Sequence, residues 1–215
     1  FGTVLGPQTL RHKHDGKVVR TPPGVGWFYG VEFSETGARV RNTADELLAL
    51  RPAPGKVPRL TTVLSRKTKT RMHRERLAFA ERLKGALGDD FVIYGKGFQP
   101  IADKAEVIDG FRYHLALENC MVADCFTEKL FDPLIGWALP VYAGCPNVED
   151  YLPTDSFVRI DIDRPEQAIA TIRDLLARDP WETHLPAIAR ARAKVLGELN
   201  IFALLRPHLG PASSE

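Results

Sequence analysis

The chain has 215 residues, of which 44% are hydrophobic, and this is enough to build a sizeable core in one large domain or one and a half small ones. The formal net charge is only +2, which excludes a protein whose whole surface binds a polyanion. No apolar run approaches the roughly 20 residues that span a bilayer, and no signal-peptide pattern opens the chain, so the sequence predicts a soluble protein.

Residues 1–58 are rich in glycine and proline, with one helical stretch near Ala44 to Leu50, and we expect this segment to be loop-heavy. The chain begins with Phe1 rather than Met, which favours a protein that has lost sequence upstream. Residues 59–179 have a different pattern, in which short apolar strands alternate with longer amphipathic helices. Residues 180–215 are expected to form C-terminal helices and a disordered Pro/Ser tail.

The alternation in residues 59–179 predicts a parallel sheet covered on both faces, because such strands need helical crossovers between them. This is a Rossmann-like α/β fold. The expected strands are Leu60 to Leu64, Phe91 to Tyr94, Tyr113 to Leu117, Leu139 to Tyr142 and Phe157 to Ile160. The expected helices are Thr70 to Leu87, one that opens at Asp103, Glu128 to Ala138, a short turn at Val148 to Tyr151, one that starts at Pro165, Trp181 to Leu196, and Glu198 to Leu205.

The run from His114 to Val141 is the most informative part of the chain, because it joins a strand, a polar exit and a helix start. Thr127 is the expected N-cap of that helix. A helix that opens at the carboxyl end of a strand directs free N–H groups into the crevice where open α/β sheets bind phosphates. Lys129 is unfavourable at a helix N-terminus on its own, so its position favours a bound anion.

This region resembles the glycosyltransferase family 10 fucosyltransferases. In that family a strand that ends in Phe-Glu-Asn is followed, after a short loop, by a helix start of Tyr-(Val/Ile)-Thr-Glu-Lys. The matching residues here are Leu117-Glu118-Asn119 and Cys125-Phe126-Thr127-Glu128-Lys129, followed by Ala138-Leu139-Pro140-Val141-Tyr142-Ala143-Gly144, Tyr151-Leu152-Pro153 and Ser156-Phe157-Val158. The order and spacing of several linked motifs make the resemblance specific, and it extends roughly from Thr61 to Leu176.

The resemblance implies that the chain is the C-terminal, donor-binding half of a GT-B glycosyltransferase. The implied reaction is an inverting transfer of fucose from GDP-fucose to a hydroxyl of a glycan acceptor, without a metal or another cofactor. Glu128 would hold sugar or ribose hydroxyls and Lys129 the diphosphate, with Thr127 beside them. Asn119 stands where the family has its strand-end Asn, although stabilisation of its own loop explains it equally well. Arg76 matches the Arg on the family's first helix.

The general base is left unassigned, because the resemblance implies a Glu in the acceptor-binding domain. Glu32 and Glu35 are candidates only by default. The protein would be cytoplasmic, as in bacteria, or a soluble fragment of a larger protein. The full protein would have no transmembrane segment in this part, and peripheral membrane association stays open.

The segment from Ser65 to Arg76 is strongly basic, and two interpretations compete for it. It could be a solvated helix face, or it could bring an arginine to the mouth of the crevice. Arg76 is our choice for that arginine, with Arg71 and Arg74 as fallbacks. The rival hypothesis is a non-catalytic module that binds a nucleotide sugar or nucleic acid through residues 66–76. The small net charge and the scarcity of aromatic residues there argue against nucleic acid.

Several further residues could be mistaken for catalytic or metal-binding residues. Cys125 replaces the family's Tyr and is expected to be a packing residue, since no His lies in a motif that would activate it. The three cysteines are expected to be buried, reduced thiols. Asp161 and Asp163 mimic a metal-binding Asp-x-Asp, but we interpret Asp163 as a helix N-cap or loop acid. Trp137 and Trp181 are expected in the core.

Overall fold

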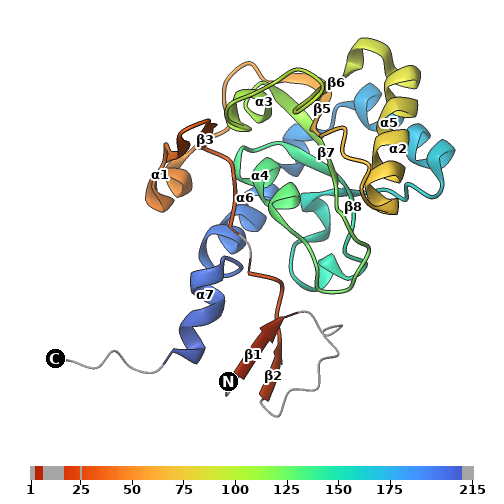
Figure 1. Ribbon diagram of the computed structural model, residues 1–215. Helices are drawn as coiled ribbons and strands as arrows, with labels where there is room; N and C mark the ends of the chain where they lie inside the picture. Colours follow the sequence, from red (N-terminus) through yellow and green to blue (C-terminus); the bar gives the residue numbers. More distant parts are fainter. Residues whose placement is uncertain (1–2, 7–16, 25, 210–215) are drawn as a thin grey trace.

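The computed structural model describes residues 3–6, 17–24 and 26–209 (Figure 1). Its centre is a five-stranded sheet made of β5 (Val57–Val63), β6 (Phe91–Tyr94), β7 (Phe111–Leu117), β8 (Leu139–Ala143) and β9 (Val158–Arg159). The strand order is β6-β5-β7-β8-β9, and each pair of neighbours is parallel. The predicted Rossmann-like fold is therefore confirmed.

Helices cover both faces of this sheet. On one face α2 (Arg71–Leu87) contacts α5 (Pro165–Arg178), and on the other α3 (Ala105–Ile108) and α6 (Trp181–Gly197) contact α4 (Glu128–Ile135) (Figure 1). The remaining C-terminal helix is α7 (Ile201–Leu205). Single 3₁₀ turns lie at Gly88–Asp90, Val148–Asp150, Thr154–Ser156 and Arg206–His208. No helix within the described residues is long and apolar enough to cross a membrane.

The core is densest around β7 and β8, because both strands lie inside the sheet and are covered on both faces. Tyr113 and Tyr142 are fully buried there, and each hydroxyl has a partner. Tyr113 Oη donates to Asp179 at 2.6 Å, and Tyr142 Oη accepts from the Cys145 amide at 2.8 Å. Gly144 must lack a side chain, because a Cβ atom there would overlap the Tyr142 hydroxyl and the Glu118 side chain.

The first part of the chain is less loop-rich than the sequence indicates. Strands β1 (Thr3–Gly6) and β2 (Lys17–Arg20) pair in parallel, and β3 (Val31–Ser34) and β4 (Gly37–Val40) form an antiparallel hairpin. The predicted helix near Ala44 is confirmed as α1 (Ala44–Ala49), with a capping box at Thr43. The division at residues 58 and 179 stays a prediction, and α6 packs against α4 and β8.

Other predicted boundaries are wrong by a few residues. Helix α4 ends before Gly136, since Trp137 adopts a positive φ of 61° that no helix can continue through. Strand β9 has only two residues, and α7 begins after Asn200, whose side chain caps it. Of the two roles predicted for Asp163, the structure shows a loop acid and not an N-cap: its amide donates to the Asp161 carboxylate at 2.9 Å, and Arg164 holds the cap position without a side-chain bond. The predicted disordered tail falls largely on residues 210–215, outside the described part.

Trp137 and Trp181 lie in the core as predicted, and Trp181 Nε1 donates to the Trp137 carbonyl at 2.9 Å. All three cysteines are free, but only Cys145 is buried. The expectation of three buried thiols is wrong for Cys120 and Cys125, because the loop that carries them lies partly at the surface.

Candidate functional site

A pocket of about 340 Å³ opens at the carboxyl edge of the sheet, where the strand order reverses between β5 and β7. Open α/β sheets with this strand order bind ligands at such a switch point. We call it the carboxyl-edge pocket. Its polar lining comes from six parts of the chain and consists of Ser65, Lys67, His73, Arg76, Lys96, Lys104, Asn119, Glu128 and Lys129.

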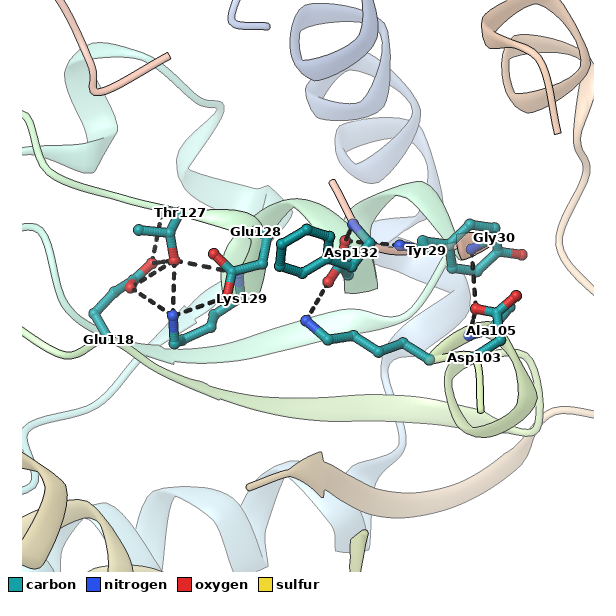
Figure 2. Close-up of polar contacts among 11 residues, drawn as sticks. Tyr29, Gly30, Asp103, Ala105, Glu118, Thr127, Glu128, Lys129 and Asp132 are labelled. Atoms are coloured by element: carbon teal, nitrogen blue, oxygen red, sulfur yellow. Dashed lines mark hydrogen bonds and ion pairs between the residues drawn. The ribbon is translucent and has the colours of Figure 1, made fainter. Parts of the chain in front are cut away.

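The start of α4 is held in place by a buried carboxylate. Glu118 is only 1% exposed and accepts hydrogen bonds from the Thr127 amide at 2.7 Å and from its hydroxyl at 2.8 Å (Figure 2). Thr127 Oγ1 in turn accepts from the Lys129 amide at 3.4 Å, so the predicted N-cap is confirmed. Thr127 does not line the carboxyl-edge pocket, but it supports Glu128 and Lys129, which do.

Lys129 is oriented by three oxygen partners. Its Nζ lies 2.9 Å from Glu128 Oε1, 3.1 Å from Thr127 Oγ1 and 3.7 Å from Glu118 Oε2. Burial alone would raise the pKa of Glu128, but Lys129, Lys104 and Thr127 together outweigh it and leave that pKa below the ordinary range. Burial raises the pKa of Glu118, with Lys129 opposing it. The ammonium group and one ionised carboxylate therefore face the pocket together.

Arg76 comes from the middle of α2 and reaches the same pocket. Its side chain is 8% exposed, and its guanidinium donates to the Asn119 side-chain oxygen. Its Nε is buried without a hydrogen-bond partner among the described residues. Burial lowers the pKa of Arg76, and Glu118 and Glu128 oppose that effect from a distance. A buried cation with an unpaired donor at a pocket wall is suited to an anionic ligand.

The structure brings together four of the five predicted donor-binding residues: Arg76, Asn119, Glu128 and Lys129 line one pocket. The fallback arginines lie elsewhere. Arg71 pairs with Glu75 along the helix at 2.5 Å, and Arg74 donates to the Thr68 carbonyl at 2.9 Å.

Arg66 also points away from the pocket. It stacks over Phe98 at 4.5 Å from the ring centroid and lies 3.6 Å from Glu81. The basic run is thus mostly a solvated face, and Arg76 is the arginine within it that turns inward.

Sequence reasoning missed several residues of this site, among them Glu118 as the support of α4, and Lys96, Lys104 and Phe28 in the pocket wall. Lys104 Nζ lies 2.5 Å from Asp132, a carboxylate that is 1% exposed in the second turn of α4. An acid inside the apolar stretch that follows the charged first turn of α4 is the local signal that could have revealed this pair.

The default base candidates do not border the site. Glu32 lies in β3 and Glu35 in the turn that follows it, and neither lines the carboxyl-edge pocket. Asp161 and Asp163 line a separate hollow beside the start of α5. Within residues 3–6, 17–24 and 26–209, no cluster of three or more His, Cys, Asp or Glu side chains could hold a metal ion.

Within the described residues, the only hydrogen-bond partner of the Cys125 side chain is another thiol, not a base. Its Sγ lies 3.3 Å from Cys120 Sγ, and burial raises the pKa of its thiol to about 12, with Cys120 adding to the shift. A thiol with so high a pKa is a poor nucleophile, which agrees with the predicted packing role.

The fold is that of the Rossmann-like half of a GT-B glycosyltransferase. A solved alpha1,3-fucosyltransferase with GDP-fucose superimposes with a TM-score of 0.52 at 18% identity, over 77% of this chain and 51% of that one. At that identity the likeness establishes the fold alone.

A family model described as the C-terminal part of glycosyltransferase family 10 (fucosyltransferase) matches residues 55–181, more than half of the chain. The chain therefore belongs to glycosyltransferase family 10, as its motifs indicated. Among curated relatives, a GDP-fucose protein O-fucosyltransferase 3 of Xenopus laevis is 39% identical over 87 residues, which is 36% of this chain and 19% of the relative. A 4-galactosyl-N-acetylglucosaminide 3-alpha-L-fucosyltransferase of Gorilla gorilla gorilla is 34% identical over 91 residues, 40% of this chain and 24% of that protein. The chain thus matches less than a quarter of the length of these two relatives.

Proposed function

We propose that this chain is the donor-binding half of a fucosyltransferase, which transfers fucose from GDP-fucose to a hydroxyl of a glycan acceptor with inversion at the anomeric carbon. The observation that carries the proposal is the meeting of two cations, Arg76 and Lys129, at the switch point of the sheet. Support for the donor comes from the relative that is a GDP-fucose protein O-fucosyltransferase and from the solved alpha1,3-fucosyltransferase that holds GDP-fucose.

Each residue has a chemical task in this proposal. The bond between the sugar and the diphosphate breaks, and negative charge builds up on the leaving phosphate. Arg76, Lys129 and the amides at the start of α4 stabilise that charge, so the reaction needs no metal ion. Glu128 accepts hydrogen bonds from hydroxyls of the donor, and Asn119 holds Arg76 in place through its side-chain oxygen. Thr127 keeps the helix start rigid.

The general base remains unassigned, because the pocket offers no second carboxylate to serve the acceptor. Among the described residues that line it, Glu128 is the only acid. Its pKa is below the ordinary range, whereas a base that works at neutral pH benefits from a raised pKa. Glu128→Gln should therefore weaken GDP-fucose binding and leave the chemical step intact. The opposite result would identify Glu128 as the base: Glu128→Gln would bind the donor normally but lose turnover, and azide or formate would restore that turnover. The compartment and any peripheral membrane association stay predictions.

Calorimetry with GDP and GDP-fucose on chelator-treated protein tests the proposal. Arg76→Ala and Lys129→Ala should each weaken binding of GDP by roughly 1.5 to 3 kcal/mol, the scale of a charge-assisted hydrogen bond. Arg71→Ala is the matched control and should bind normally, since this side chain is 84% exposed and lies outside the pocket. Thermal unfolding of each variant verifies that the fold is retained.

Three outcomes would contradict parts of this proposal. Binding that vanished with chelator and returned with manganese would refute the metal-free site and reopen Asp161 and Asp163. Equal losses from Arg66→Ala, Lys67→Ala and Lys69→Ala, with none from Lys129→Ala, would favour the rival module that binds polyanions, as would a steep dependence on salt. In a preparation that transfers fucose, NMR of the anomeric proton of the product reports its configuration. A retained configuration would refute inversion.

A further inference from the structure

The segment from Phe28 to Gly30 is fastened beside the carboxyl-edge pocket by buried carboxylates. Asp132 of α4 accepts the amides of Phe28 and Tyr29 at 2.7 and 3.0 Å, and Asp103 accepts the amide of Gly30 at 3.0 Å (Figure 2). Both acids are 1% exposed. A buried carboxylate that accepts several amide hydrogens fixes the backbone strongly, so the position of Phe28 relative to α4 is well defined.

The ring of Phe28 is held from two sides but remains open to the pocket. Lys104 Nζ lies 5.2 Å from the ring centroid, and Phe33 packs edge-on against it at 5.6 Å between centroids. The side chain is nevertheless 42% exposed and lines the carboxyl-edge pocket together with Glu128 and Lys129. An anchored aromatic ring beside convergent polar groups is typical of a binding site for a small organic ligand.

We propose that Phe28 contacts the donor directly, with its ring packed against the apolar face of the transferred sugar while Glu128 binds that sugar's hydroxyls. This inference rests on the proposed function. The sugar is bonded directly to the diphosphate, whereas the nucleobase is separated from it by the whole ribose. Because Phe28 borders the same pocket as Lys129, which we assign to the diphosphate, the sugar is the nearer of the two rings.

The chemistry of the neighbours agrees with a sugar. Phe28 has no polar atom on its ring, so the ring can pack against C–H groups, of which a 6-deoxy sugar offers a methyl group as well as ring hydrogens. Glu128 is ionised and next to Lys129, so it can accept from hydroxyls on the opposite, polar side. Residue 28 lies before the stretch 55–181 that matches the family model, so this contact would come from outside the matched region.

The test compares the affinities of GDP-fucose and GDP for wild type, Phe28→Ala and Phe28→Tyr by calorimetry. Phe28→Ala should weaken GDP-fucose binding roughly threefold to tenfold, the scale of one aromatic contact, and leave GDP binding unchanged. Phe28→Tyr keeps the ring and should restore most of the loss. Phe202→Ala is the control, because this ring is 81% exposed on α7 and does not line the pocket. Thermal unfolding separates an unfolded variant from one that has lost a contact.

The failure of this inference can be told apart from the failure of the proposed function. If wild type binds neither ligand, the proposed function itself is wrong and the Phe28 assignment falls with it. If wild type binds both and Phe28→Ala weakens both equally, the ring contacts the nucleotide and the sugar assignment is wrong. If wild type binds both and the variant loses neither, Phe28 is only a surface residue.

Discussion

Glu118 offers the sharpest test of how the site is built, because it is buried and supports the residues that face the ligand. Glu118→Ala would remove the acceptor of the Thr127 amide and hydroxyl, at 2.7 and 2.8 Å, and the carboxylate 3.7 Å from Lys129 Nζ. Breaking a buried charged pair by removing one partner costs about 3 to 5 kcal/mol, and we expect the low end of that range since Lys129 keeps Glu128. Glu118→Gln retains an acceptor for the amide and should cost only about 1 to 2 kcal/mol.

Urea unfolding followed by circular dichroism measures these losses, and a double-mutant cycle with Thr127→Val isolates the hydroxyl contact. Glu81→Ala is the matched control: its carboxylate is 53% exposed in a surface pair with Arg66, and such a pair contributes about 0 to 1 kcal/mol. A loss below about 1 kcal/mol in Glu118→Ala would refute the view that this carboxylate holds the start of α4.

Three further predictions concern His114, Cys125 and Gly144. Burial lowers the pKa of His114 to about 3 from its ordinary 6.5, with Lys104 and Lys56 adding to the shift. The unfolded chain therefore takes up a proton that the folded one refuses. The contribution of His114 to stability should fall by about 1.4 kcal/mol per pH unit as the pH drops from about 5.5 to about 3. His114→Leu should flatten that slope in urea titrations at several pH values, His184→Asn should not, and an equal slope in all three proteins would contradict the assignment. Cys125, with its pKa near 12, should react with iodoacetamide at pH 8 roughly 100-fold more slowly than a free thiol in peptide mass mapping, whereas fast alkylation would reject the packing role. Gly144→Ala should destabilise the fold by about 1 to 3 kcal/mol in the same urea assay, since its Cβ would meet the Tyr142 hydroxyl; unchanged stability would mean that the neighbours yield freely.

The parts of the site that sequence could predict are those made by neighbours in the chain. Thr127, Glu128 and Lys129 form one helix start, and the capping pattern that reveals it is local. The periodicity of α2 places Arg76 on the inward face with Phe79 and Leu83, because these residues share a side of the helix. The parallel arrangement of the sheet follows in the same way from the regular alternation of short strands and helices, whereas the strand order comes only from the structure.

The parts that sequence could not predict depend on contacts between distant residues. The amides of Phe28 and Tyr29 donate to Asp132, which lies more than 100 positions further along the chain. Nothing in the sequence near residue 28 indicates that this segment packs against α4. Local patterns also overestimate regularity. The run around Phe157 has strand composition, but only Val158 and Arg159 pair with β8.

Two cations of the pocket, Arg76 and Lys129, are already oriented by neighbouring side chains. Lys129 is held by Thr127, Glu128 and Glu118, and Arg76 is packed within α2 and held by Asn119. Side chains fixed in this way lose little conformational freedom on binding, so more of their interaction energy remains for the ligand. The two charges nevertheless differ. Lys129 is already balanced by carboxylates, whereas Arg76 is buried with an unpaired Nε. Arg76 should therefore contribute more free energy than Lys129 to the binding of an anion. This contribution should be largest in the transition state, in which negative charge develops on the leaving diphosphate.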